Sequence, residues 1–499
     1  MQNSQAKDQP NNNKRLPKVV VIGAGMTGIL LVIKLREAGI TNITIFEKAD
    51  RLGGTWRENT YPGAACDVPS YLYSYSFELN PNWSHIYAHG DEIQNYFERI
   101  GKKYQVTETI HFNEEVTDAI YRDKLWHIKT SKNRHYQADF VISATGILHH
   151  PKLPSISGID CFKGKSFHTA RWDHQFKIDA STRIGVIGNG STAAQAIPEL
   201  INGGASVKVF QRTPQWILPN FDFKISEKRK QKLQDDPALL MRYRRWGKFL
   251  LEQFFTKAVT GQWLQKKVLE MGCQLNLLLS VKSSILRKKL TPNYQVGCKR
   301  IIFNQTYYKA IQTSNAELVT DSIEKINSQG IITRNPENKF QQHDVDLIVY
   351  ATGFDAFKFM RPINLIGKNG ISIEQAWSQE IKLYRSMFMP EFPNFFLMLG
   401  PNTPIGNYSV IAMSEVQTDY LIQLIKKWQF GEFNQIEPKP SAVKAFNEMV
   451  KQGLKSTAWV GGCQSWYLDA QGDPILWPYD WQRWVDEMKT PDMEDFNCE

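Results

Sequence analysis

Two glycine-rich turns, each between a run of apolar residues and an expected helix, constrain the fold of this chain more than any other feature. The first turn, GAGMTG, places Gly23, Gly25 and Gly28 in the pattern GxGxxG. Such glycines let the chain turn tightly and let a pyrophosphate approach the backbone at the N-terminus of a helix. A helix is expected over about 26–38 and a strand at 43–46. The turn therefore predicts a dinucleotide-binding unit.

The residue after the second strand of each unit indicates which nucleotide it binds. Glu47 follows 24 positions after Gly23, where a carboxylate can accept hydrogen bonds from ribose hydroxyls. In the second turn, GNGSTA, Arg212 follows 24 positions after Gly188. A carboxylate there would repel a 2′-phosphate, whereas Arg can bind one, so this turn predicts NADPH. Its expected binding residues are Gly188, Gly190, Ser191, Thr192, Ala193, Arg212 and Thr213.

One unit of the chain thus ends in an acidic residue and the other in a basic one. We interpret this combination as a flavoprotein that takes hydride from NADPH, with FAD at the first turn. The similar segments DFVISATG and DLIVYATGF are each expected to close one unit where the chain passes into the other. The predicted fold class is α/β, with two Rossmann-like dinucleotide-binding domains and a helical insertion in the NADPH domain. A disordered leader is expected at 1–15. The FAD-binding domain is expected in two parts, at 16–155 and at 351–499, and the second part includes the C-terminal loops. The NADPH domain is expected at 156–350, with its helical insertion at about 219–292.

Composition excludes several classes of protein. The 499 residues are too many for one compact core, and no apolar run reaches the roughly 18 residues that a membrane span needs. The six cysteines show neither CxxC nor CxxxxC spacing and the ten histidines show no HExxH, which argues against a zinc site, a flavin disulfide reductase and a catalytic metal. The polar N-terminus has no apolar signal-peptide core, so a cytoplasmic location is expected.

Positive charge is concentrated in one segment. Residues 224–300 hold 18 Lys or Arg and 5 Asp or Glu, a net charge of +13, whereas the whole chain carries +10. No nucleic-acid-binding motif accompanies this charge, so nucleic acid is not an expected partner. Cofactor phosphates, an anionic membrane surface and solvated helix faces are the remaining interpretations. The large apolar residues of this segment are expected to pack in its core: Trp246, Phe249, Leu250, Phe254 and Phe255.

Seven motifs, in order along most of the chain, resemble those of one family. They are GAGMTG, GGTW, YPGAACDVPSYLYSYSF, FKGKSFHTARWDH, GNGSTAA, GCKR and ATGF. Together they resemble the Baeyer–Villiger type of class B flavoprotein monooxygenase. The fingerprint of that family is F-x-G-x-x-x-H-x-x-x-W followed by Pro or Asp. Here it is met by Phe162, Gly164, His168, Trp172 and Asp173.

The resemblance implies a reaction. NADPH reduces FAD, O₂ adds to the reduced flavin, and the resulting C4a-peroxide inserts one oxygen beside the carbonyl of a small-molecule ketone, giving an ester or lactone. The anionic peroxide needs a fixed cation in a dry site, which suits Arg because it cannot give up its proton. The resemblance gives this role to Arg300, paired with Asp67, and places Lys299 beside the 2′-phosphate with Arg212. It implies these FAD-binding residues: Gly23, Gly25, Thr27, Gly28, Glu47, Gly54, Thr55, Trp56, Asp67, Tyr73 and Val116.

Two other functions stay open, and the oligomeric state is not predicted. An enzyme that oxygenates nitrogen or sulfur would use the protonated peroxide on the same scaffold. A non-oxygenating flavin-binding or membrane-docking protein would keep the first turn but would not need an NADPH site. His168 and Trp172 are expected to fasten the segment between the two domains and to couple motion of the NADPH domain to the reaction, rather than to act on substrate. The alternative is a purely structural His and a packed Trp.

Overall fold

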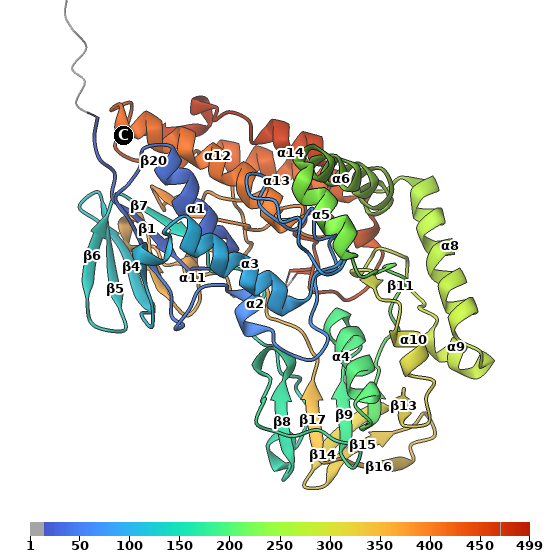
Figure 1. The fold of residues 1–499 in the computed structure, drawn as a ribbon. Coiled ribbons are helices and arrows are strands. Elements are labelled where there is room, and N and C mark those ends of the chain that lie inside the picture. Colours follow the sequence, from blue (N-terminus) through green and yellow to red (C-terminus); the bar gives the residue numbers. More distant parts are fainter. Residues whose placement is uncertain (1–13, 470) are drawn as a thin grey trace, which may run out of the picture.

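The computed structural model describes residues 14–469 and 471–499, which contain two five-stranded parallel sheets (Figure 1). The first has the order β19-β7-β1-β2-β3, with the bounds Phe395–Leu397, Phe140–Ser143, Val19–Ile22, Ile43–Phe46 and Ile110–His111. The second has the order β13-β10-β9-β17-β8, with the bounds Ala316–Val319, Ser206–Phe210, Arg183–Ile187, Leu347–Tyr350 and Lys165–His168. The leader predicted at 1–15 lies, up to residue 13, outside the described residues.

The first sheet is covered on both faces, as its mostly apolar strands require. In β1, Val19 and Val21 pack into the core that holds α1 (Met26–Glu37) and α12 (Val410–Gln429). Val20 and Ile22 alternate to the opposite face. That face packs on a four-stranded sheet of order β18-β4-β5-β6, with the bounds Asn364–Ile366, Val116–Arg122, Leu125–Thr130 and His135–Ala138. The C-terminal part of the chain thus supplies β19 to the sheet that the N-terminal part begins, and α12 and β18 to the layers on its two faces.

The second sheet has the same construction. Its β9 sends Ile184 and Val186 toward α4 (Ser191–Asn202) and Ile187 toward the other face. A three-stranded antiparallel sheet covers that other face, with the bounds β14 Ser322–Asn327, β15 Gly330–Arg334 and β16 Phe340–Asp344. Each parallel sheet therefore carries one glycine-rich turn between its central strand, β1 or β9, and the helix that follows.

Residues 227–290 are almost entirely helical and lie along the outside of the molecule (Figure 1). The elements are α5 Glu227–Asp235, α6 Pro237–Leu250, the π-helix Leu251–Thr256, α7 Lys257–Val259, α8 Trp263–Ser280 and α9 Ser284–Leu290. Side chains of Ser226, Asp236 and Ser283 cap α5, α6 and α9. No helix of the described residues is long and apolar enough to cross a membrane.

The expectation that the large apolar residues of these helices form a core is wrong for most of them. The exposed fractions are 60% for Trp246, 48% for Phe249, 38% for Leu250 and 58% for Phe254, whereas Phe255 packs against Phe303. The reason is that no described element covers the outer face of α6. Helical spacing fixes which residues share a face, but it does not say whether another element will cover that face.

Candidate active site

One cavity of about 490 Å³ lies between the two glycine-rich turns. Strand ends of the first parallel sheet, the turns next to the second parallel sheet and the C-terminal loops line it. Fourteen of the predicted site residues are among them: Gly23, Gly25, Thr27, Glu47, Gly54, Thr55, Trp56, Asp67, Tyr73, Val116, Gly190, Ser191, Thr192 and Arg300. The structure does not bring eleven others to the cavity wall: Gly28, Gly188, Ala193, Arg212, Thr213, Lys299, Phe162, Gly164, His168, Trp172 and Asp173.

The first turn has the shape that a pyrophosphate requires. Gly23 has φ of +102°, and a Cβ on it would lie 2.7 Å from the carbonyl oxygen of Ala144. A Cβ on Gly54 would lie 3.0 Å from Cα of Gly25, so two glycine backbones meet at this point of the cavity. The N-terminus of α1 has no side-chain cap, which leaves its backbone N–H groups for an anion. These features fit the diphosphate of FAD.

Glu47 is buried and is fixed by its neighbours. Its carboxylate accepts hydrogen bonds from the backbone N–H of Ala24 at 2.8 Å and of Ala49 at 3.0 Å. Arg57 pairs with the same carboxylate at 3.0 Å. The arrangement holds an acceptor at the end of β2, where the ribose of a dinucleotide on the first turn would lie.

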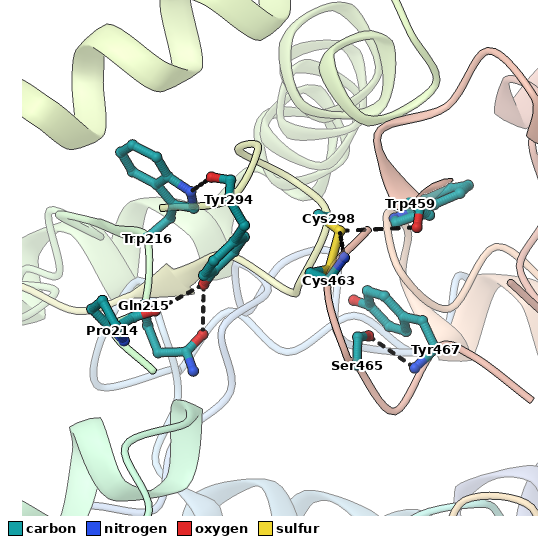
Figure 2. Close-up of a disulfide and its surroundings, with 9 residues drawn as sticks. All are labelled: Pro214, Gln215, Trp216, Tyr294, Cys298, Trp459, Cys463, Ser465 and Tyr467. Atoms are coloured by element: carbon teal, nitrogen blue, oxygen red, sulfur yellow. Dashed lines mark hydrogen bonds between the residues drawn. A yellow bond between two sulfur atoms is a disulfide. The ribbon is translucent and has the colours of Figure 1, made fainter. Parts of the chain in front are cut away.

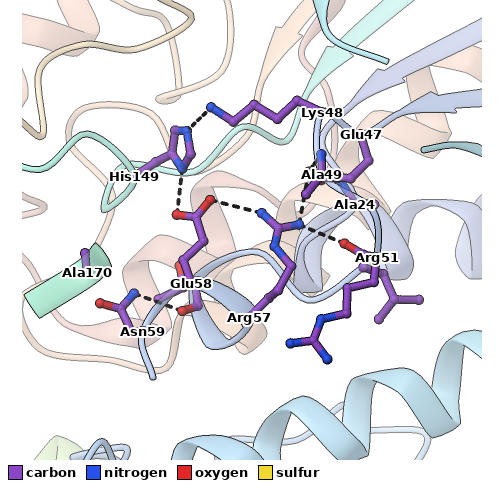
Figure 3. A network of polar contacts seen from close by, with 12 residues as sticks. Ala24, Glu47, Lys48, Ala49, Arg51, Arg57, Glu58, Asn59, His149 and Ala170 are labelled. Atoms are coloured by element: carbon purple, nitrogen blue, oxygen red, sulfur yellow. Dashed lines mark hydrogen bonds and ion pairs between the residues drawn. The ribbon is translucent and has the colours of Figure 1, made fainter. Parts of the chain in front are cut away.

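Arg57 also begins a charged network at the cavity wall that the sequence did not predict (Figure 3). Its guanidinium pairs with Glu58 at 3.0 Å, and Glu58 accepts a hydrogen bond from His149, which contacts Lys48. Burial by itself raises the pKa of the Glu58 carboxyl, but His149, Arg171 and Arg57 lower it overall. Four ionisable side chains from three segments of the chain therefore lie together at the cavity wall.

Arg300 and Asp67, 233 positions apart in sequence, form a bidentate ion pair at the cavity wall. The guanidinium Nη2 lies 2.7 Å from Oδ1 and Nε lies 3.0 Å from Oδ2. The side chains are 28% and 19% exposed, respectively. Burial alone would lower the pKa of Arg300, but the Asp67 carboxylate and the neighbouring Tyr467 raise it. The guanidinium of Arg300 is therefore a permanently charged group that Asp67 holds in one direction at the cavity wall.

The second turn needs glycine for the same reason as the first. Gly188 has φ of +113°, and a Cβ on it would lie 2.4 Å from the carbonyl oxygen of Ala351. Lys299 lies over the ring of Tyr294, and both burial and the positive charge of Arg212 lower its pKa. Lys299 and Arg212 repel each other, and a doubly charged phosphate between them would stabilise both charges. The residues present fit the 2′-phosphate of NADPH.

Comparison with known proteins decides which enzymes share this arrangement. A profile of the pyridine nucleotide-disulphide oxidoreductase family matches residues 20–236. An uncharacterised monooxygenase of Mycobacterium bovis is 42% identical, covering 93% of this chain and 92% of that protein. A Baeyer–Villiger monooxygenase of Streptomyces coelicolor is 35% identical, covering 92% and 88%. The chain belongs to the Baeyer–Villiger monooxygenase family. The fold class and the family predicted from the sequence are confirmed.

Solved structures agree with this assignment. The closed crystal structure of cyclohexanone monooxygenase superposes with a TM-score of 0.86 at 25% identity, covering 97% of this chain and 99% of that one. An oxidised steroid monooxygenase bound to NADP superposes with a TM-score of 0.85 at 26% identity, with the same coverage. This Baeyer–Villiger monooxygenase is therefore a flavin-dependent enzyme with two dinucleotide-binding domains.

The fingerprint segment of the monooxygenase is built into the second domain. Its residues 165–168 are the edge strand β8, and a Cβ on Gly164 would meet both Phe162 and the backbone of Asp346. His168 is buried, accepts a hydrogen bond from the backbone N–H of Ala170 at 3.1 Å and packs on Phe354. Burial lowers the pKa of His168 to about 4, so the ring is neutral at pH 7. These contacts favour a structural or coupling role over a catalytic one.

The two chain segments that cross between the domains are hydrogen-bonded to each other. The backbone N–H of Lys152 donates to the carbonyl of Gly353 at 2.9 Å, and Pro151 and Phe354 form a β-bridge. His168 packs directly on this crossing through Phe354. His168 therefore lies beside the two segments that connect the domains, as a residue that couples domain motion to the site would.

The structure contains a disulfide that the sequence did not predict, between Cys298 and Cys463 (Figure 2). Cys298 precedes Lys299 and Arg300 directly, while Cys463 belongs to the C-terminal loop that carries Tyr467 beside the Arg300 guanidinium. Trp466 of this loop lines the cavity. The disulfide therefore links the segment that contains Arg300 to the loop that contains Tyr467. Cysteine spacing gave no signal, since the two residues are 165 positions apart.

Proposed function

We propose that this monooxygenase inserts one oxygen atom of O₂ beside the carbonyl of an apolar small-molecule ketone, giving an ester or lactone. The observation that carries the proposal is the bidentate pair of Arg300 and Asp67 at the wall of a cavity that both nucleotide turns reach. FAD, once reduced by NADPH, supplies activated oxygen in this space. The residues of the chain bind the two cofactors, hold a cation in place and exclude water.

FAD would lie along the first turn. Gly25 and Gly54 leave room for its diphosphate, and Glu47 presents its carboxylate to the ribose. Trp56 and Tyr73 line the cavity, where the indole N–H donates to the Tyr73 hydroxyl at 2.9 Å and orients both rings. NADPH would lie across the second turn, with Arg212 and Lys299 at its 2′-phosphate.

Arg300 acts by charge rather than by proton transfer. When oxygen attacks a ketone, negative charge develops on the carbonyl oxygen, and a cation fixed in a poorly solvated site stabilises that charge more than water would. Arg suits the task because it stays protonated, and Asp67 keeps its guanidinium from turning away. Neither side chain has to reorganise as the charge forms.

The substrate end of the cavity is apolar. The side chains of Ile405, Tyr408, Val410 and Trp466 line it next to Arg300. Such a surface binds the hydrocarbon part of a ketone, while the single cation orients its carbonyl. Location in the cytoplasm stays a prediction, and the disulfide is the feature that bears on it, because disulfides are rare in that compartment.

Product analysis tests the proposal. The purified enzyme is incubated with NADPH, ¹⁸O₂ and a panel of cyclic, linear and aryl ketones plus sulfides, and the products are identified by mass spectrometry. We expect esters or lactones that carry one ¹⁸O atom, formed with a matching consumption of NADPH. Sulfoxides without any ester would instead assign the enzyme to heteroatom oxygenation. A colourless protein that binds no flavin and consumes no NADPH would exclude an oxygenase altogether.

A further inference from the structure

The outward face of α8 is apolar. Nine of its 18 residues are exposed, and only Lys267 and Gln274 among these are polar. The other seven are Trp263, Leu264, Val268, Met271, Leu275, Leu278 and Leu279, which are 54–74% exposed. Their spacing of three and four places them on one side of the helix, opposite the buried Cys273 and Leu277. A stripe of this width normally packs against a core, but here it faces outward.

The apolar face continues onto neighbouring elements. The π-helix lies against α8, and α6 precedes it at the same end of the molecule, with α9 below (Figure 1). Trp246 and Phe249 of α6 are exposed and stack on each other with ring centroids 5.6 Å apart. Phe254 and Ile285 are 58% and 73% exposed. We call this set the docking face: the seven residues of α8 together with Trp246, Phe249, Phe254 and Ile285.

Basic side chains border the docking face. The exposed ones are Arg242, Arg245, Lys267, Lys282, Lys288 and Lys289. Residues 224–300 carry +13 while the whole chain carries +10, so the rest of the molecule carries −3. The net positive charge of the enzyme is therefore carried by the segment that also carries the docking face. A second copy of the chain would bring the same positive charge against it, whereas an anionic surface complements it.

We propose that the docking face binds the surface of a bilayer that contains anionic phospholipids. The apolar side chains would enter the boundary between headgroups and acyl chains, and the Lys and Arg side chains would lie at the level of the phosphates. Trp246 and Trp263 suit this depth because an indole prefers the interface. The helix would lie along the membrane plane.

Two elements that carry the docking face, α6 and the π-helix, are joined to the region of the cavity by a short chain of contacts. Lys248 lies over the ring of Trp481, which stacks on the cavity-lining Tyr408 at 3.8 Å. The hydroxyl of Thr256, in the π-helix, donates to the carbonyl of Asn407 at 3.4 Å. An enzyme docked in this way would hold its apolar substrate end near the membrane. The docking itself does not depend on the reaction proposed above, so each can fail without the other.

Vesicle flotation of the flavin-loaded full chain tests the proposal. Binding is measured to vesicles of phosphatidylcholine alone and of phosphatidylcholine with about one quarter phosphatidylserine. The test variant carries Met271→Gln and Leu275→Gln, which remove apolar surface without changing charge. The control variant is Phe340→Gln, because Phe340 on β16 is 65% exposed but lies outside the docking face. The absorbance of the bound flavin and the circular dichroism spectrum check that the variants are folded, independently of the reaction.

We expect the phosphatidylserine vesicles to bind at least about tenfold more tightly than the neutral ones, since each basic residue near an anionic surface adds to affinity. The Met271→Gln and Leu275→Gln variant should bind about tenfold more weakly, whereas Phe340→Gln should bind as wild type does. The proposal is overturned if wild type binds neither vesicle or if the double variant keeps its affinity. A third outcome also overturns it: the wild type binds no vesicles and sediments as a dimer, while the double variant sediments as a monomer. In that case a second copy of the chain covers the docking face.

Discussion

Replacing Asp67 by Asn should slow oxygenation about 30-fold and leave flavin reduction by NADPH unchanged. Asn keeps the size of the side chain and one acceptor oxygen, but it removes the charge that holds the guanidinium of Arg300 at 2.7 and 3.0 Å. Removing one partner of a fully buried pair costs roughly 3–5 kcal/mol, while an exposed pair contributes at most about 1 kcal/mol. The side chains of this pair are 28% and 19% exposed, so we expect a cost between these limits, about 2 kcal/mol. If that cost falls on the transition state, the rate of oxygenation decreases about 30-fold.

The assay separates the two half-reactions. Anaerobic bleaching of the flavin by NADPH reports reduction, and ester formed per unit time by the reduced enzyme in aerated buffer with ketone reports oxygenation. Asp346→Asn is the matched control, because Asp346 holds Arg183 in the same bidentate geometry, at 2.7 and 3.0 Å, but is half exposed and lies outside the cavity. Its oxygenation rate should stay within about twofold of wild type. Equal rates in the two variants would refute the reasoning.

Three further predictions concern the other parts of the site. Arg212→Ala should raise KM for NADPH about 10- to 100-fold and leave KM for NADH unchanged, because only NADPH carries the 2′-phosphate; steady-state kinetics with both cofactors checks this. The unfolding free energy of wild type should fall as pH drops from about 6.5 toward 4, because His168 binds a proton in the unfolded chain but stays neutral in the folded one. The His168→Asn variant, whose side-chain oxygen can still accept from the Ala170 N–H, should show a flatter profile over this pH range. An unchanged profile would contradict the neutral buried ring. Alkylation of the denatured, unreduced protein should label four of the six cysteines, whereas Cys298→Ser should label all five that remain, because Cys463 then loses its partner; five or six labels in wild type would show that the bond is absent.

What the sequence predicted well depends on short-range patterns. Gly23, Gly25 and Glu47 lie within one strand–turn–helix–strand unit, so their spacing alone fixes where each must stand relative to a nucleotide. The same holds for Gly188 and Arg212. Two such units, each with apolar strands, are enough to predict two parallel sheets with covered faces.

What the sequence did not predict depends on long-range geometry or on what covers a surface. The network of Arg57, Glu58 and His149 joins segments about 90 positions apart, and none of its members follows a motif that the chain displays. The disulfide joins Cys298 to a loop 165 positions away. The exposed face of α8 has the periodicity of a core helix, and only the assembled fold shows that none of the described residues covers it.

The Arg300→Ala variant tests the central claim most directly, namely that a fixed cation in the cavity makes oxygen insertion into a ketone possible. The measurement compares the rate of flavin reduction by NADPH with the yield of ester or lactone per NADPH consumed, in wild type and variant. We predict that reduction stays within about threefold of wild type while the yield falls by about 100-fold or more, since removing one preorganised charge-stabilising group costs that much. An ester yield in the variant close to that of wild type would contradict the account.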